Sequence, residues 1–253
     1  MSAVEFYDGL APLYHLVYEN WEASIERQGK DLDSIIRSCL GETPKSILDV
    51  ACGIGTQSLG LAALGHRVTG SDLSPAAVQR ARREAHSRGM SIEFTVADMR
   101  APNDYRGRDF DVVLCADNSL PHLLTDEEIT GALGRFLAAL KPGGLCLITV
   151  RDYAAMERDG VQVKQHGVRS DKGTRWVLFQ LWEWHGSIYD LHFYFVADDG
   201  QSTCTTHVFR SSYYAVSIEH LIRLMVSAGF EQVRRIDDVF FQPVIAGRRR
   251  LVA

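Results

Sequence analysis

The sequence lacks the features of several protein classes. Its 253 residues include five cysteines, an odd number, and no two of them form a close pair of the metal-binding kind. No stretch approaches the roughly 20 apolar residues of a membrane helix, and the N-terminus has no apolar signal-like core. The net charge of −5 offers no general attraction for nucleic acid. We therefore expect a cytoplasmic protein with reduced thiols and without a metal, membrane or nucleic-acid partner.

A third glycine is missing from the most informative motif of the chain. An apolar strand that begins at Ser46 runs into Asp49, then into Gly53 and Gly55, and a helix follows from about Gln57. The dinucleotide fingerprint needs a glycine or alanine three residues after Gly55, and this chain has Ser58 there. The acid ahead of the glycines is also foreign to that fingerprint. An adenosine-bearing cofactor without a pyrophosphate therefore fits better than NAD.

Polar residues end the next three predicted strands as well. Arg67 to Asp72 is a short strand with an acid at its end, Ile92 to Ala97 is followed by Asp98-Met99, and Phe110 to Ala116 is followed by Asp117-Asn118. In an open parallel sheet these ends meet at the ligand crevice. Asp72 also lies about 20 residues past the glycines, where a carboxylate contacts ribose hydroxyls.

With these motifs the sequence resembles the class I S-adenosylmethionine-dependent methyltransferases. The pattern Asp49-x-x-x-Gly53-x-Gly55, Asp72, Asp98-Met99 and Leu140-Lys141-Pro142-Gly143-Gly144 carries the resemblance over residues 45–150. Within the family the likeness is closest to the glycine and sarcosine N-methyltransferases, through Asp49–Gly53, Asn118–Leu123 and Arg151–Tyr153. The resemblance implies S-adenosyl-L-methionine as cofactor and S-adenosyl-L-homocysteine as product.

The resemblance also implies which residues hold the cofactor. Asp72 would accept both ribose hydroxyls, and Asp98 would accept from the adenine amino group. Arg27 would hold the cofactor's carboxylate. The predicted cofactor-binding residues are Asp49, Ala51, Gly53, Gly55, Asp72, Leu73, Asp98, Met99, Asp117, Arg27, Tyr14 and Trp21. Tyr14 or Trp21 would pack against the sulfonium by cation–π attraction, although aromatic residues at this spacing are also typical of core packing.

Three residues are candidates for substrate binding or catalysis. Asn118 would hold a substrate amine or carboxylate, and His122 would contact the cofactor or act as a base. Arg151 would clamp a substrate carboxylate through a bidentate pair. The alternatives are a loop histidine bonded to a backbone group and a salt bridge from Arg151 to Asp152 or another surface acid.

The organisation of the chain follows from its patterns and from the resemblance. Residues 3–40 are predicted to be helical, with a break at 19–22. Strands and helices alternate over residues 46–150, which indicates a parallel sheet. Three antiparallel strands are predicted at Trp176–Trp184, Ile188–Val196 and Thr203–Tyr214, and they are followed by a helix and by strands at Val233–Asp237 and Val239–Arg248.

The predicted fold class is α/β: a Rossmann-like, mostly parallel seven-stranded sheet with helices on both faces and a small antiparallel insertion as a cover. The expected units are an N-terminal helical cap (1–44), the cofactor-binding core (45–153), the β insertion (154–214) and a C-terminal helix and hairpin (215–253).

The predicted function is methyl transfer from S-adenosylmethionine to a small molecule, with the amino group of glycine, sarcosine or a related acid as target. The alternatives are an O- or C-methyltransferase, a non-catalytic cofactor-binding protein and an NAD-dependent oxidoreductase. The sequence leaves the oligomeric state open, a homo-oligomer included.

Overall fold

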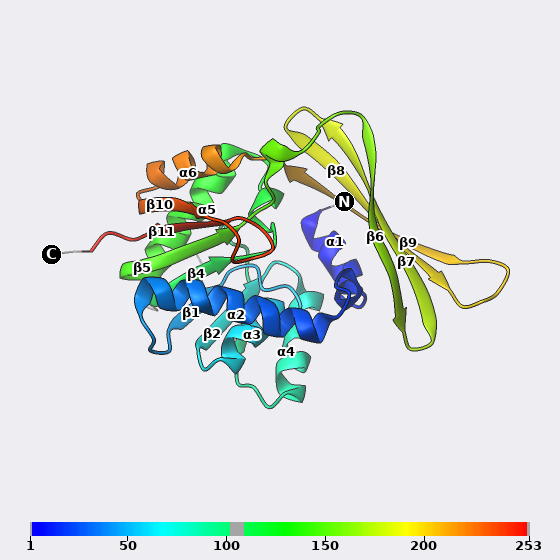
Figure 1. Ribbon diagram of the computed structural model, residues 1–253, viewed down its shortest axis with the longest axis horizontal. Helices are drawn as coiled ribbons and strands as arrows, with labels where there is room; N and C mark the ends of the chain where they lie inside the picture. The colour runs from blue at the N-terminus through cyan, green and yellow to red at the C-terminus, as the bar shows by residue number, and fades with distance from the viewer. Residues whose placement is uncertain (1, 102–108, 252–253) are drawn as a thin grey trace.

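The computed structural model describes residues 2–101 and 109–251, which form two β-sheets with helices around the larger one (Figure 1). Among these residues, no helix has the length and apolar character needed to cross a membrane.

The larger sheet has seven strands in the order β10-β11-β5-β4-β1-β2-β3. Neighbouring strands from β1 to β5 are parallel, whereas β11 runs antiparallel to both β5 and β10. The mostly parallel seven-stranded sheet predicted from the sequence is thus confirmed. Its strands are β1 (Ser46–Asp49), β2 (Arg67–Asp72), β3 (Glu93–Val96), β4 (Phe110–Cys115), β5 (Leu140–Thr149), β10 (Glu231–Ile236) and β11 (Val244–Arg248).

Helices cover both faces of this sheet (Figure 1). On one face Leu32 and Ile36 of α2 pack in a cluster with Ile47 of β1. On the other face Leu133 of α5 and Leu221 of α6 belong to a second cluster. The helices are α1 (Ala3–Leu10), α2 (Trp21–Leu40), α3 (Thr56–Ala63), α4 (Pro75–Ser87), α5 (Asp126–Ala139) and α6 (Ile218–Ser227), and the short 3-10 helices are η1 (Tyr14–Val17), η2 (Leu120–His122) and η3 (Tyr153–Ala155).

Capping residues fix where the helices begin. The side chain of Ser74 accepts a hydrogen bond from the backbone amide of Ala77, and Pro75 occupies the first turn of α4. Thr125 caps α5 in the same way through Glu128. Helix α4 therefore begins shortly after the end of β2, and α5 begins after the loop that follows η2.

The smaller sheet has four antiparallel strands, in the order β6 (Val161–Asp171), β7 (Thr174–His185), β8 (Ile188–Asp198) and β9 (Thr205–Tyr214). Helix α1 lies between the two sheets (Figure 1), and its Phe6 and Leu10 pack against Tyr189 and Phe195 of β8. The sequence does not predict β6, because its residues are mostly polar and largely exposed.

The strand predicted at Val239–Arg248 is shorter in the structure. β11 begins only at Val244, and residues 238–242 form bends. Asp238 has a φ of 61°, and Pro243 has no amide hydrogen for a strand ladder. Both residues break the extended conformation there.

Candidate functional site

The glycine turn after β1 brings backbone atoms to the edge of the sheet. Gly53 and Gly55 have φ angles of 53° and 98°, in the left-handed region that favours glycine. A Cβ atom added to Gly53 would meet open space rather than protein. The backbone amide of Gly53 donates to Oδ2 of Asp72 over 2.8 Å, so the turn is fixed to the end of β2.

Asp72 is buried and held from two sides. Its Oδ1 accepts from the backbone amide of Ser74 over 2.9 Å, while Gly53 bonds Oδ2. Burial raises the pKa of Asp72, although hydrogen bonds from the Ser74 and Gly53 amides oppose this. A carboxylate has about four lone-pair positions, so both oxygens keep capacity for further donors.

A cavity of about 330 Å³, here called the strand-end cavity, opens at these strand ends. It is walled by the ends of β1, β2 and β3, by η2 and by the first residues of α1. Its lining includes Ser2, Ala3, Val4, Tyr7, Tyr14, Ala51, Gly53, Asp72, Leu73, Asp98, Met99 and His122.

Asp49 lies just below this edge, fully buried at the end of β1. Ser58 donates to its Oδ2 over 2.7 Å, whereas Oδ1 has no hydrogen-bond partner among the described residues. Burial raises the pKa of Asp49 to about 7. A buried acceptor without a donor fits a ligand group that carries N–H bonds.

A second cavity of about 540 Å³, the distal cavity, lies between the larger sheet and β6 and β7. Its polar lining is Asp117, Arg151, Lys164, His166, Gln180 and Gln242, and Trp182 and Phe241 are aromatic walls. A connecting cavity of about 60 Å³ shares Asp117, Arg151, His166 and Gln180 with it. The connecting cavity also shares Tyr7 and Tyr14 with the strand-end cavity, so it lies between the other two cavities and these tyrosines border both it and the strand-end cavity.

Arg151 follows β5 and enters the distal cavity between two aromatic rings. Its Cζ lies 5.2 Å from the ring centre of Trp182 and 5.8 Å from that of Tyr213, and Nη1 donates to the Tyr189 hydroxyl over 3.1 Å. Among the described residues Arg151 forms no ion pair. Asp152, a possible partner considered from the sequence, bonds Arg235 over 2.9 Å. The guanidinium therefore keeps donors for an anionic ligand.

His122 lies in η2 at the wall of the strand-end cavity. Its Nε2 is 2.8 Å from the Tyr7 hydroxyl, and its Nδ1 is 3.2 Å from Oγ of Ser211. Burial and the charge of Arg151 lower the pKa of His122 to about 3. The ring is therefore neutral at pH 7 and a weak proton acceptor.

Comparisons with known proteins agree with this geometry. Residues 47–144 match the methyltransferase domain family. The chain is 34% identical to the glycine/sarcosine N-methyltransferase of Parasynechococcus marenigrum over 146 residues, 58% of this chain and about half (51%) of that relative. It is 35% identical to the dTDP-3-amino-3,6-dideoxy-alpha-D-glucopyranose N,N-dimethyltransferase of Streptomyces fradiae over 55% of this chain and 52% of that relative.

Residues 47–144 thus form a methyltransferase domain, and the relatives that match more of the chain are methyltransferases as well. The solved sugar N-methyltransferase KedS8 from Streptoalloteichus has the same fold, with a TM-score of 0.78 at 21% identity over 94% of this chain and 93% of that chain. S-adenosyl-L-methionine is the cofactor of this methyltransferase, as the sequence predicted.

The residues of the strand-end cavity fit this cofactor. Asp72 offers carboxylate oxygens to a ribose diol, and the open space above Gly53 admits a ligand against the backbone. Asp49, fully buried beneath the cavity, supports the turn that carries Ala51 and Gly53. When bound, the cofactor supplies an electrophilic methyl group on a sulfonium.

Most of the cofactor residues predicted from the sequence lie at this cavity. Ala51, Gly53, Asp72, Leu73, Asp98, Met99 and Tyr14 line it, whereas Asp49 and Gly55 support it from within the turn. Asp98 is bonded by its neighbour Arg100 through the backbone amide and the guanidinium. Asp98 remains at the cavity wall, and the ion pair with Arg100 neutralises part of the charge of its carboxylate.

Two predicted site residues after β4 lie outside the strand-end cavity. Asn118 is 1% exposed, and its amide is bonded to the backbone of Arg151 and to the Tyr153 hydroxyl. It lines none of the three cavities and positions Arg151 rather than a substrate. Asp117 lines the distal and connecting cavities and not the strand-end cavity.

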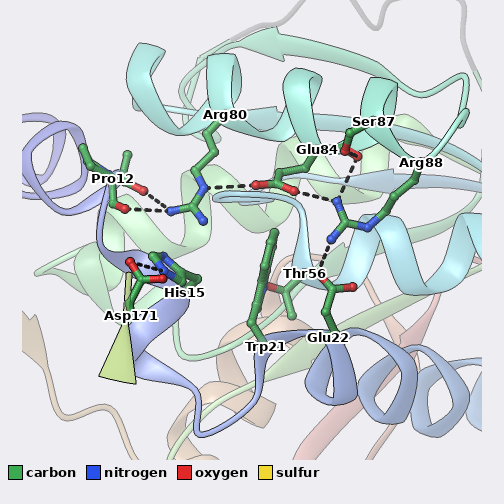
Figure 2. Close-up of polar contacts among 11 residues, drawn as sticks. Pro12, His15, Trp21, Glu22, Thr56, Arg80, Glu84, Ser87, Arg88 and Asp171 are labelled. Atoms are coloured by element: carbon green, nitrogen blue, oxygen red, sulfur yellow. Dashed lines mark hydrogen bonds and ion pairs between the residues drawn. The ribbon is translucent and has the colours of Figure 1, made fainter. Parts of the chain in front are cut away.

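Trp21 and Arg27 lie away from all three cavities. Figure 2 shows Trp21 between Arg80, which belongs to α4, and Arg88, which follows this helix. The Cζ atom of each arginine lies 5.3 Å from the centre of the Trp21 ring. The indole of Trp21 donates to Thr56 over 2.8 Å. Its cation–π partners in the structure are thus two arginines. Arg27 is exposed on α2 and, among the described residues, its side chain donates to Ser24 of its own helix.

Several wall residues have no local signal in the sequence. Lys164 and His166 come from the unpredicted strand β6, and Gln180 and Gln242 are isolated polar residues. Alternation along β7 does place Trp182 inward. The aromatic residues of β8 divide by the same rule, since Tyr189 is buried and Tyr194 is only half-buried.

Proposed function

We propose that this methyltransferase acts on the amino group of a small molecule that also carries an anionic group, such as glycine, sarcosine or a related acid. The Arg151 guanidinium is the observation that carries the proposal. It lines the connecting cavity, which borders the strand-end cavity at Tyr7 and Tyr14, and it has no ion-pair partner among residues 2–101 and 109–251.

The geometry of Arg151 suits a carboxylate. Trp182 and Tyr213 hold its planar group by cation–π contacts, and Asn118 fixes its backbone amide. A guanidinium held in this way can give two parallel hydrogen bonds to one carboxylate. The substrate's other end would then extend through the connecting cavity towards Tyr7 and Tyr14.

An amino sugar is a second candidate acceptor. The distal cavity, at about 540 Å³, falls in the range of about 300–1,000 Å³ that suits ligands larger than glycine. Trp182 and Phe241 could contact a ring, and Lys164 adds a second cation for phosphate groups. The relative from Streptomyces fradiae is named for methylation of such an amino sugar.

The test is methyl transfer from labelled S-adenosylmethionine to matched acceptors. One set pairs each amine with its hydroxyl analogue, as in glycine with glycolate, and each acid with its amide, as in glycine with glycinamide. A second set contains bulkier amino acids and dTDP-amino sugars. Mass spectrometry identifies the methylated atom. We expect transfer to nitrogen, with the highest kcat/KM for acceptors that carry an anionic group.

Three outcomes would contradict the proposal. Transfer only to hydroxyl acceptors would make the protein an O-methyltransferase. Equal kcat/KM for acids and their amides would remove the anion requirement. Tight binding of S-adenosylhomocysteine without transfer to any acceptor would favour a non-catalytic cofactor-binding protein.

A further inference from the structure

We propose that the carboxylate of Asp117 receives the ammonium group of the acceptor and takes its proton before methyl transfer. This inference rests on the proposed function, since it needs an amine acceptor. It makes Asp117 a catalytic residue for the substrate rather than part of the cofactor's cradle.

The backbone conformation directs Asp117 into the cavities. Asp117 and Asn118 have φ angles of 54° and 61°, which only a few per cent of non-glycine residues adopt. The amide of Asp117 donates to Oγ1 of Thr149 over 2.7 Å, and that of Asn118 to the Thr149 carbonyl over 3.0 Å. Held by these two bonds to β5, the unusual turn presents the carboxylate to the distal and connecting cavities.

The carboxylate has weak partners and spare capacity. Oδ2 accepts from the Tyr18 hydroxyl over 3.1 Å, and Oδ1 accepts from Nε2 of Gln242 over 3.3 Å. Both donors are neutral, and Asp117 forms no ion pair within the part of the chain that the structure describes. A carboxylate has about four lone-pair positions, so each oxygen of Asp117 can accept one further hydrogen bond.

Asp117 lies where the acceptor's amino group would sit, between the cavity of the cofactor and the cavity of the acceptor. Tyr14 lines both the strand-end cavity and the connecting cavity, and Asp117 lines the connecting cavity beside it. Burial raises the pKa of Tyr14, and the charges of both Asp117 and Asp72 add to this effect. Asp117 is therefore the acidic group that a substrate meets next to the cofactor's cavity.

The groups around Asp117 come from several elements. Arg151 follows β5, His166 and Lys164 lie on β6, Tyr14 and Tyr18 are in and after η1, and Gln242 precedes β11. Burial raises the pKa of Asp117, and Arg151 opposes this. Burial and the charge of Arg151 lower the pKa of His166 to about 4, so this ring is neutral at pH 7 and does not compete as a cation for the carboxylate.

The proton balance of the proposed step is simple. The acceptor enters as R–NH3⁺, and one N–H proton moves to an oxygen of Asp117, which leaves R–NH2 with a free electron pair. That pair forms the new N–C bond as the S–C bond breaks with its pair on sulfur. The product leaves as R–NH2⁺–CH3, and Asp117 returns its proton to solvent. Each turnover thus releases one proton.

His122 is the other titratable candidate for this step, and the structure disfavours it. The pKa of about 3 makes its ring a weaker proton acceptor than a carboxylate whose pKa is raised by burial. Tyr7 and Ser211 also occupy both of its ring nitrogens. Each carboxylate oxygen of Asp117, in contrast, can accept a further hydrogen bond.

The experiment compares Asp117→Asn with wild type and with Asp237→Asn, a control that removes an exposed acid outside the cavities. Asparagine has nearly the same shape and tolerates positive φ. Calorimetry with S-adenosylhomocysteine should give affinities within about twofold for all three proteins. At pH 7, kcat/KM for the best amine of the panel should fall at least about 100-fold in Asp117→Asn, the lower end of general-base effects.

The pH profile separates a proton acceptor from a structural residue. Without Asp117 the enzyme must capture the neutral amine from solution, whose fraction rises tenfold per pH unit below the amine's pKa. We therefore expect kcat/KM of Asp117→Asn to rise about tenfold per unit from pH 7 to pH 9, while wild type and Asp237→Asn rise much less.

A binding measurement makes the inference independent of turnover. Glycine and glycolate, and phenylalanine and phenyllactate, are titrated into the protein saturated with S-adenosylhomocysteine. Wild type should prefer the ammonium member of each pair, and Asp117→Asn should lose that preference. A variant that keeps the preference and the wild-type pH profile would overturn the inference, as would one that loses cofactor affinity in proportion to activity.

Failure of the two proposals can be told apart. If wild type methylates only hydroxyl acceptors, the proposed function fails. If wild type methylates amines and Asp117→Asn does so equally well, only the role of Asp117 fails.

Discussion

The Tyr7 hydroxyl lies 2.8 Å from Nε2 of His122 and joins α1 to η2. Tyr7 belongs to the helix between the two sheets, and η2 follows the strand end of β4. The contact therefore ties the N-terminal helix to the edge where the cofactor's cavity opens.

The neutral state of His122 should appear in the pH dependence of stability. Its pKa is about 3 in the folded protein against about 6.5 in an unfolded chain. The unfolded state binds the proton first as the pH falls, so stability is lost between about pH 6.5 and pH 3. We expect His122→Gln to lose less stability than wild type in this window, measured by urea unfolding at pH 7, 5 and 4. His86→Gln on the exposed face of α4 is the control and should parallel wild type.

Arg151→Gln should raise KM for a carboxylate acceptor far more than it weakens cofactor binding. Charged hydrogen bonds contribute about 1.5–3 kcal/mol, so the expected rise is about 10- to 150-fold. Arg151→Lys keeps the charge but loses the bidentate geometry, so its KM should lie between those of wild type and Arg151→Gln. Steady-state kinetics and calorimetry with S-adenosylhomocysteine measure the two effects. An unchanged KM in Arg151→Gln would exclude the carboxylate clamp.

Asp72→Asn should weaken cofactor binding by about 1–3 kcal/mol, because an amide replaces one of the two acceptor oxygens that face the ribose. The Gly53 turn also depends on Asp72, so a lower unfolding temperature should accompany the loss. Calorimetry with S-adenosylhomocysteine gives the affinity, and Asp237→Asn is again the control. Wild-type affinity in Asp72→Asn would remove the ribose assignment.

Trp21→Phe should lower the free energy of unfolding by about 1–3 kcal/mol without changing cofactor affinity. The variant leaves Thr56 without its indole donor and weakens the contacts with Arg80 and Arg88 (Figure 2). Arg27→Ala, on the exposed face of α2, should change neither quantity. A large loss of affinity in either variant would restore the sequence-based role near the cofactor.

The cofactor side could be predicted from the sequence because its signals are local. The glycines after β1 and the acid at the end of β2 are close in the chain, and the parallel sheet brings their strand ends together by rule. Gly53 and Asp72 accordingly share a hydrogen bond over 2.8 Å. The fold, the family and the cofactor all follow from these short motifs.

The acceptor side depends on long-range packing that no short motif encodes. Arg151 and Lys164 come from different sheets, yet both lie over the ring of Trp182. From the sequence, Trp21 could face either the cofactor or α4. The packing of α2 places its ring against Arg80 and Arg88. Asp117 and Asn118 are adjacent in sequence, yet their left-handed backbone sends one into the cavities and buries the other.

The place of α1 has a consequence for the speed of the catalytic cycle. Ser2, Ala3 and Val4 wall the cofactor's cavity, while Phe6 and Leu10 of the same short helix are anchored beneath the second sheet. We expect the spent donor to depart when this helix swings aside. At saturating acceptor the maximal velocity should then be governed by that opening motion, and good and poor nucleophiles should turn over at similar rates.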